Sequence, residues 1–214
     1  MPDVHTNPVV RGERVYLRPL ERDDAIASNL AINDREVAHL TGFPWPVDKG
    51  MSERWYDEEV AKKQGETAFF FAICKLGSAQ MIGGCNFHFI HQGVHSDVGI
   101  FMFPGNEGKG LGTDAMNALV DFGFGELGLQ RVGLTVAPDN ERAIRSYEKC
   151  GFVREGIRRH SRRHRGQAMD ELVMSITRPE WEALERPRSW DYPAPRTPAK
   201  RRPPAARKRS TPKG

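Results

Sequence analysis

The most informative part of the chain runs from Val98 to Thr113 and reads VGIFMFPGNEGKGLGT. An apolar segment that predicts a strand ends there in a turn with four glycines, and a helix is expected to begin directly afterwards. Glycine lets a backbone approach a ligand closely and adopt positive φ angles. The free N–H groups of a first helical turn attract phosphate. The turn therefore predicts a phosphate-binding loop, to which Lys109 adds positive charge.

Two known phosphate-binding patterns do not fit this turn. A P-loop needs Lys and then Ser or Thr after its last glycine, whereas Leu111 follows Gly110. The dinucleotide fingerprint needs a third glycine where Thr113 stands, and an acidic residue about twenty positions further on. That region holds Gln130 and Arg131 instead. An ordinary glycine-rich turn stays open as the alternative.

A second motif covers Asp139–Phe152 and reads DNERAIRSYEKCGF. At helical spacing Ala143, Ile144 and Tyr147 fall on one face, with Asn140 one turn upstream on the same side. The motif follows a strand expected at 131–136. A phosphate-binding strand–turn–helix unit is therefore followed by a strand–helix unit with an inward-facing tyrosine.

Together the two motifs resemble the GNAT N-acetyltransferase superfamily, and within it the branch of the ribosomal-protein N-terminal acetyltransferases. The opening segment VYLRPL at 15–20, with Asp23 and Asp24 after it, is typical of the same branch. The resemblance covers about residues 10–185. The residues that carry it are Gly108, Lys109, Gly110, Leu111, Gly112 and Thr113 in the turn, and Asn140, Ala143, Tyr147, Gly151 and Phe152 in the second motif.

The expected fold class is mixed α/β, with a GNAT-like acyl-CoA N-acyltransferase fold in one domain at 1–186. Antiparallel strands come first, then a β-α-β crossover and a terminal hairpin, which favours a mixed sheet with helices on its faces. Strands are expected at 13–18, 67–75, 81–90, 94–103, 131–136, 152–158 and 168–177, and helices at 21–32, 52–63, 113–127, 140–150 and 179–184.

The resemblance implies transfer of an acetyl group from acetyl-CoA, as co-substrate, to a primary amine by direct attack in a ternary complex. A protein N-terminal amine is the favoured acceptor. A small-molecule amine, such as a polyamine, an amino acid or an antibiotic, is the alternative. The rival reading is a catalytically idle acetyl-CoA-binding module, or an adaptor associated with RNA or the ribosome.

Acetyl transfer needs a group that protonates the departing thiolate and a group that receives the proton of the amine. Tyr147 is the expected general acid, because a phenol with a pKa of about 10 stays protonated at neutral pH. A plain core tyrosine is its alternative role. Asp97 is the expected base, since related enzymes often carry an acid at this place, and His88, His91 and His95 are further candidates.

The resemblance also implies a cofactor site. The backbone of Phe101, Met102 and Phe103 is expected to bind the pantetheine arm, and the turn at 108–113 the diphosphate. Asn140 bonds the cofactor, caps its own helix, or does both. A carboxylate aimed at a diphosphate would repel it, so Glu107 is expected to point to solvent. Asp114 raises the same concern more mildly.

The net charge of +4 conceals an asymmetry. Residues 187–214 hold nine Lys and Arg, seven Pro and only one acid, so this segment carries +8 and residues 1–186 carry −4. Such a composition cannot bury enough apolar surface to offset the entropy of ordering. We expect a disordered basic tail at 187–214. It either binds nucleic acid or another acidic surface, or is only a solubilising extension.

A second basic run lies between two expected strands. It is expected to be a solvated hairpin, with a site for an acidic substrate or nucleic acid as the alternative. Aromatic residues in the first half either line an acceptor groove or cap the core. The run comprises Arg154, Arg158, Arg159, Arg162, Arg163 and Arg165 with His160 and His164, and the aromatics are Phe43, Trp45, Trp55 and Tyr56.

The remaining features exclude several classes of protein. The longest apolar stretch, 68–74, is far shorter than the ~20 residues of a membrane helix, and residues 1–14 have no signal-peptide core. The three cysteines form neither a CxxC pair nor a zinc pattern. We therefore expect a cytoplasmic protein with reduced thiols, no metal and no membrane partner. Exposed strands make a homodimer a reasonable expectation.

Overall fold

The computed structural model describes residues 10–41, 45–91, 94–164 and 166–193. Its centre is one mixed sheet of eight strands in the order β1-β2-β3-β4-β5-β6-β8-β7. This confirms the expected α/β class with a mixed sheet. The strands are β1 (Val10–Arg11), β2 (Val15–Pro19), β3 (Phe69–Lys75), β4 (Met81–His91), β5 (His95–Met102), β6 (Arg131–Val136), β7 (Val153–His164) and β8 (Gln167–Thr177).

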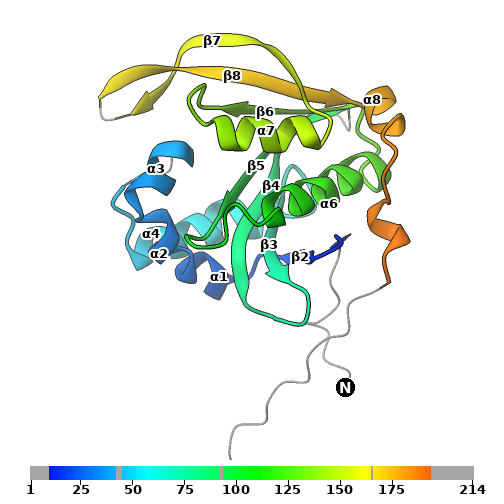
Figure 1. The fold of residues 1–214 in the computed structure, drawn as a ribbon. Helices are drawn as coiled ribbons and strands as arrows, with labels where there is room; N and C mark the ends of the chain where they lie inside the picture. The colour runs from blue at the N-terminus through cyan, green and yellow to red at the C-terminus, as the bar shows by residue number, and fades with distance from the viewer. Residues whose placement is uncertain (1–9, 42–44, 92–93, 165, 194–214) are drawn as a thin grey trace, which may run out of the picture.

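Helices cover both faces of the sheet (Figure 1). The strands alternate between the two faces. Phe71 therefore packs with α6 and α7, and Phe70 packs with Val60 and the helices that precede β3. The helices are α1 (Arg22–Ala27), α2 (Asn29–Ile32), α3 (Arg35–Thr41), α4 (Lys49–Trp55), the π-helical turn η2 (Tyr56–Val60), α5 (Ala61–Lys63), α6 (Leu111–Gly125), α7 (Glu141–Lys149), α8 (Arg178–Glu182) and the 3-10 turn η3 (Ser189–Asp191).

The sheet opens between β5 and β6. These two strands are the parallel pair of the β-α-β crossover, and they pair only from His95 to Asp97 on β5 and from Arg131 to Gly133 on β6. Beyond these residues β5 continues along β4 to Met102, while β6 continues along β8 to Val136. The two strands therefore separate toward the glycine-rich turn, and a gap in the sheet results.

Helix α6 holds both ends of the folded chain. The Asp114 carboxylate accepts the backbone N–H groups of Glu13, Arg14 and Val15 at 2.9, 2.8 and 2.9 Å. Gly12 has to lack a side chain, because a Cβ there would lie 2.7 Å from this carboxylate. Asp114 thus faces the turn between β1 and β2 rather than the glycine-rich loop, which removes the concern that its charge repels a phosphate.

The second acidic anchor on α6 is Asp121, which is only 1% exposed. Its carboxylate accepts the indole N–H of Trp181 at 2.8 Å, the backbone N–H of Ser189 at 2.8 Å and two guanidinium N–H groups of Arg186 at 2.7 and 2.9 Å. Residues 187–193, assigned above to the tail, therefore lie against the domain. Residues 194–214 lie outside the described part.

The structure differs from the expected elements in three places. The helix expected at 21–32 is divided into α1 and α2, and α3 was not expected. The pairing of β7 with β8 reaches His164 and Gln167, so the basic run from Arg154 to His164 lies within β7 and not between two strands. Arg165 lies outside the described residues. The expected hairpin is confirmed, and it is much longer than the sequence indicated. Among the described residues, no helix is long and apolar enough to cross a membrane.

We expect the substitution Asp121→Ala to lower the free energy of unfolding by about 3–5 kcal/mol, because a buried guanidinium and an indole N–H would lose their acceptor. Urea denaturation measures this change. The matched control is Glu141→Ala, which breaks an exposed i,i+4 pair with Arg145 and should cost about 0.5 kcal/mol or less. Equal losses in the two variants would contradict the anchoring role of Asp121.

Candidate functional site

A cavity of about 830 Å³ lies where β5 and β6 separate. Residues from α1 to α4, from β3 to β5, from the glycine-rich turn and from α7 line it. Eight of the predicted site residues are among them: Phe101, Met102, Gly108, Gly110, Gly112, Thr113, Asn140 and Tyr147. The other four, Asp97, Phe103, Lys109 and Leu111, are not.

The glycine-rich turn presents the N-terminal end of α6 to this cavity. The N-cap residue is Gly110, in the left-handed conformation with φ +74°, and Gly105 and Gly108 also have positive φ. The first N–H groups of a helix have no intrahelical acceptor. No side chain among the described residues caps this end of α6. The helix therefore offers free N–H donors and the positive end of its dipole to an anion.

The positive charge of Lys109 does not reach the cavity. Its ammonium donates to the carbonyl oxygen of Gly105 at 2.6 Å and thereby closes the turn. Arg14, which the sequence analysis did not select, donates to the carbonyl oxygen of Lys109 at 2.6 Å and lies beside Gly110. Arg14, from the turn that precedes β2, therefore places a cation beside the start of α6. Leu111 turns its side chain into the core.

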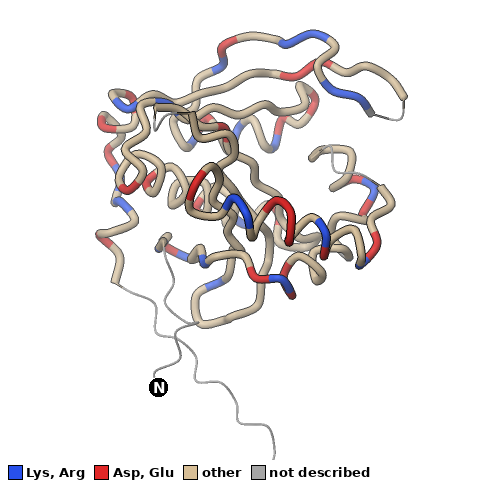
Figure 2. Tube along the Cα trace, turned by 180° about the vertical axis from the view of Figure 1, so that it is seen from behind, with Lys and Arg blue, Asp and Glu red and all other residues tan. Residues whose placement is uncertain are grey.

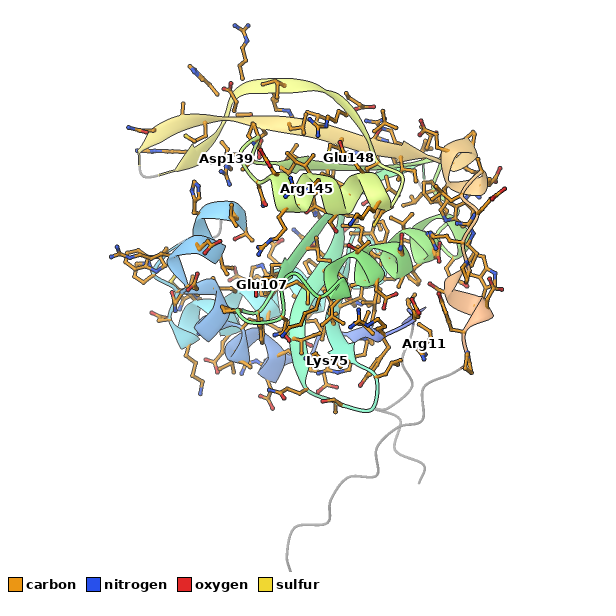
Figure 3. The ribbon with its side chains drawn as sticks, viewed as in Figure 1. Arg11, Lys75, Glu107, Asp139, Arg145 and Glu148 are labelled. Atoms are coloured by element: carbon orange, nitrogen blue, oxygen red, sulfur yellow. The ribbon has the colours of Figure 1, made fainter. Side chains whose placement is uncertain are left out.

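Charges of both signs line the cavity. Glu107 is partly buried and is one of the residues that line the cavity, while the direction of its carboxylate stays a prediction. The cations Arg142, Arg145 and Lys149 project from α7 at i, i+3 and i+7 and line the same cavity. Figure 3 shows Glu107 on the loop before α6 and Arg145 on α7. The cationic side of α7 offsets the carboxylate of the loop.

Tyr147 lies on the inner face of α7, one turn after the buried Ile144, and its ring packs 6.0 Å from that of Phe152. Hydroxyls of Thr113 and Ser146 lie 2.7 Å apart and link the start of α6 to α7. Burial, with a smaller contribution from Cys150, raises the pKa of Tyr147 to about 12. The phenol therefore keeps its proton at neutral pH, so it can donate a hydrogen bond but cannot act as a base there.

Asn140 has the structural role that the sequence analysis offered as an alternative. Its side-chain oxygen accepts the backbone N–H of Ala143 at 3.2 Å and so caps α7. Asn140 also lines the cavity. The cap fixes the direction of α7 and thereby the place of Tyr147.

The backbone of β5 offers hydrogen-bonding groups to the opening. Phe103 donates its N–H to Ile82 of β4 at 2.8 Å, and its ring packs on the face opposite α6. Backbone groups of a strand point alternately to its two neighbours. The N–H and C=O groups of Ile100 and Met102 therefore point away from β4, to the side where β6 has separated. Ile100 was not among the predicted residues, because the direction of the alternation depends on the register with β4.

Asp97 lies outside the cavity, in contrast to the expectation for a base. It is exposed, and its Oδ1 lies 2.5 Å from the place where a Cβ of Gly133 would stand. His88, its cross-strand partner on β4, does line the cavity. The candidates His91 and His95 stack on each other, with ring centroids 4.7 Å apart, and are exposed.

The His88 ring is held from one side. Its Nδ1 lies 3.0 Å from the side-chain amide of Asn86, and the amide oxygen occupies the space that a side chain at position 99 would fill. Gly99 thus makes room for the pair. Burial lowers the pKa of His88 from its usual value, and the charge of Asp97 opposes this only in part. The imidazole is therefore neutral at pH 7.

The half of the cavity formed by α1 to α4 is largely apolar, with Ile32, Val37, Leu40, Met51 and Trp55 in its lining. Of its two carboxylates, Asp34 already accepts the N–H groups of Glu36 and Val37, and Glu36 is exposed.

Of the aromatic residues considered above, Trp55 lines this half. Trp45 is exposed beside Arg35, and the hydroxyl of Tyr56 lies 3.4 Å from the carbonyl oxygen of Leu20. Phe43 lies outside the described residues. The described part of the chain contains no group of three metal-ligating side chains.

Comparison with known proteins gives a consistent result. The profile of the Acetyltransferase (GNAT) domain matches residues 14–153. The probable N-acetyltransferase YjcK of Bacillus subtilis is 29% identical over 184 residues, which cover 81% of this chain and 99% of that protein. The spermidine N(1)-acetyltransferase of Escherichia coli K12 is 30% identical over 177 residues, or 82% of this chain and 88% of that protein.

Two solved structures have similar folds. The spermidine N-acetyltransferase of Vibrio cholerae, in complex with CoA and spermine, has a TM-score of 0.71 at 25% identity over 79% of this chain and 98% of that chain. RimJ of Mycobacterium smegmatis, in complex with CoA-disulfide, has a TM-score of 0.70 at 23% identity over 84% of this chain and 89% of that chain. The likeness to RimJ is one of fold, and the ribosomal-protein branch stays a prediction.

We expect the ring protons of His88 to titrate below pH 6.5, the usual midpoint of histidine, because burial disfavours the charged ring. NMR measures this midpoint, with His88→Gln identifying the signal. By linkage, the unfolded chain takes up this proton at higher pH than the folded one. The wild type should therefore lose stability relative to His88→Gln as the pH falls below about 6.5. A midpoint above 6.5 would contradict the burial of this ring.

Proposed function

The chain belongs to the GNAT acetyltransferase family, and we propose that it transfers the acetyl group of acetyl-CoA directly to the α-amine of a peptide or protein N-terminus. The observation that carries the proposal is the single cavity itself. It joins the uncapped start of α6, the protonated Tyr147 and the neutral His88 to an apolar compartment large enough for an acceptor. The start of α6 suits the diphosphate of an acetyl donor, and the apolar compartment suits an acceptor that carries an amine.

The residues present fit acetyl-CoA. Gly108 and Gly110 leave open space at the loop, where a Cβ at position 108 would meet no atom within 4 Å, and the free N–H groups of α6 suit a diphosphate. The outward-facing backbone groups of Ile100 and Met102 suit the amides of a pantetheine arm. Arg14 beside Gly110 and the cations of α7 add positive charge. The coenzyme supplies the acetyl group as a reactive thioester.

Tyr147 is the proposed hydrogen-bond donor to the departing sulfur. A thiolate whose conjugate acid has a pKa of about 8.5 is a weaker base than a phenolate with a pKa of about 12. The phenol therefore stabilises the developing thiolate chiefly by a strong hydrogen bond, while it keeps most of its hold on the proton. Two contacts, the Thr113–Ser146 link and the Asn140 cap, hold the ring in place.

His88 is the proposed base in place of Asp97, because it lines the cavity and is neutral at pH 7. A neutral imidazole accepts a proton on the nitrogen that carries no hydrogen. The Asn86 amide nitrogen lies at Nδ1 and donates to it, so the neutral ring carries its hydrogen on Nε2. The ring can take up the amine proton at Nδ1 once this amide turns its oxygen toward that nitrogen. An α-amine with a pKa of about 8 needs only such a weak base, whereas a lysine amine with a pKa of about 10.4 needs more.

The lining favours a peptide over a polyamine. A polyamine carries several positive charges, and each one needs a carboxylate when it leaves water. The lining holds three carboxylates and three cations, so it has no excess of negative charge, and Asp34 is already bonded to the backbone. Spermidine is the second candidate, because relatives of similar length are named spermidine N(1)-acetyltransferases. A nucleic-acid or other acidic partner of the basic tail at 187–214 and a homodimer stay predictions.

Tyr147→Phe should lower kcat by roughly 10²-fold, because the leaving sulfur loses its hydrogen-bond donor. The dissociation constant for acetyl-CoA, measured by calorimetry, should stay the same. Tyr56→Phe is the matched control, since the Tyr56 hydroxyl lies near the Leu20 carbonyl and outside the cavity lining. An unchanged kcat in Tyr147→Phe would assign the proton to water.

The acceptor is tested by the release of CoA thiol from acetyl-CoA, with peptides that have a free N-terminus and with spermidine. The peptides should have the higher kcat/KM, and the same peptides with a formylated N-terminus and an internal lysine should not react. Preference for spermidine would overturn the acceptor assignment. Binding of acetyl-CoA without turnover of any amine would favour the catalytically idle module over the enzyme.

A further inference from the structure

The hairpin of β7 and β8 extends past the end of β6 and lies above α7 on the side of α3 (Figure 1). Near its far end Arg162 donates to the carbonyl oxygens of His39 at 2.8 Å and Leu40 at 3.4 Å. These are carbonyls of the last turn of α3, where a cation is favourable. The hairpin is therefore anchored on a helix whose residues Val37, Leu40 and Thr41 line the acceptor half of the cavity.

The segment that leads into α7 also contacts α3. The imidazole Nε2 of His39 lies 4.0 Å from Oδ2 of Asp139, and Asp139 directly precedes the cavity residue Asn140. Three elements, the β7–β8 hairpin, α3 and the start of α7, thus meet at one edge of the cavity. Arg162 and its neighbours on β7 therefore lie beside the end of α3, whose residues Leu40 and Thr41 line the cavity.

The carboxylates around this hairpin are all engaged. Glu155 pairs with Arg131 at 2.5 Å, and Glu148 of α7 pairs with Arg154 at 2.8 Å. Asp170 accepts the backbone N–H of His160 at 2.9 Å. Glu171 accepts the hydroxyls of Ser161 at 2.8 Å and Thr135 at 3.1 Å. Glu171 is also the cross-strand partner of Arg158, but the two side chains form no ion pair within 4.0 Å.

Arg158, Arg159 and Arg163 form what we call the basic rim. All three are exposed, and none of them has a carboxylate within 4.0 Å among the described residues. Figure 2 shows Lys and Arg positions gathered along this part of the hairpin. Each guanidinium can bind a carboxylate through two parallel hydrogen bonds. The rim therefore presents three guanidinium groups without an ion pair, on the part of the hairpin that Arg162 anchors on α3.

We propose that the basic rim binds acidic side chains of the acceptor polypeptide a few residues beyond its N-terminus, so that the enzyme selects acidic N-terminal segments. The inference rests on the proposed function, acetylation of a peptide α-amine. An extended peptide advances about 3.3 Å per residue, so its amine occupies the cavity while later residues pass over the hairpin. A polyamine would be repelled at the same place.

An acidic peptide fits the arrangement better than a nucleic acid. A peptide carries the primary amine that the cavity serves and the carboxylates that the rim serves on one chain. RNA has acidic groups and no aliphatic primary amine, so it would use the rim without using the cavity. The three arginines are also interrupted by the anchored Arg162 and by Ser161, which bonds within the hairpin. This leaves a short row of separate contacts rather than a broad phosphate-binding surface.

The test compares two peptides with the same first two residues, followed by either four Glu or four Gln, on the full-length chain at low salt. The wild type should have a kcat/KM about five- to tenfold higher for the Glu peptide, from two or three exposed ion pairs. The difference should shrink as the salt concentration rises. The double substitution Arg159→Gln and Arg163→Gln removes two of the three guanidinium groups, so it should reduce the preference to about twofold or less and leave kcat/KM for the Gln peptide unchanged.

The matched control is the double substitution Arg54→Gln and Lys62→Gln, which removes the same positive charge from exposed positions outside the cavity lining. It should retain the preference for the Glu peptide. Equal kcat/KM for the two peptides in the wild type, or an equal preference in the rim variant, would overturn the role of the rim, while acetylation of both peptides would still uphold the proposed function. Acetylation of spermidine and of neither peptide would overturn the proposed function itself.

A polyuridine oligonucleotide serves as the probe for the other class of partner. Binding that the rim substitutions abolish, together with no preference between the two peptides, would make the rim a nucleic-acid surface and the proposal wrong. Binding that is equal in the wild type and the rim variant would leave the peptide result to stand as support for the proposal.

Discussion

The structure depends on a helix that keeps one end unsatisfied. Free N–H groups at the start of α6 are costly unless an anion or water accepts their hydrogen bonds, and a helix held there loosely would fray. The rest of α6 prevents this, because its sides are buried from Leu111 to Phe124. Asp114 then fixes it to the start of the domain and Asp121 fixes it to the end. The binding end is thus supported by contacts made about one and three turns further along α6.

Local signals made the glycine-rich turn and the second motif readable from the sequence. A strand, a turn with left-handed glycines and a capped helix depend on neighbouring residues, and Gly110, Asn140 and Tyr147 all lie where these patterns put them. The place of Asp97 relative to the cavity could not be predicted from local patterns. Asp97 does lie on β5, as predicted. It is still paired with Gly133 of β6, so its side chain lies before the point where the two strands separate and does not line the cavity. Lys109 likewise bonds a carbonyl within its own turn, which charge alone does not indicate.

Long-range pairing accounts for the other differences. The arginine-rich part of β7 has a composition typical of solvent-exposed segments, and it becomes a strand because β8 offers apolar residues in register and because α3 accepts hydrogen bonds from Arg162. Residues 187–193 have the composition of a disordered tail, yet Ser189 is buried against Asp121. Arg162 and α3, like Ser189 and Asp121, are far apart in the sequence, so no local sequence pattern predicts these contacts.

The short pairing of β5 with β6 divides the domain into two lobes that share a narrow seam. Three rungs of the ladder hold them at one end, and at the other end their exposed backbones face each other across the cavity. A molecule bound between β5 and β6 can bridge the backbone groups that the two strands leave unpaired there. The coenzyme would then contribute to the structure of the protein as well as to its reaction, and after each release of CoA the two halves of the sheet would be joined only by the short β5–β6 pairing.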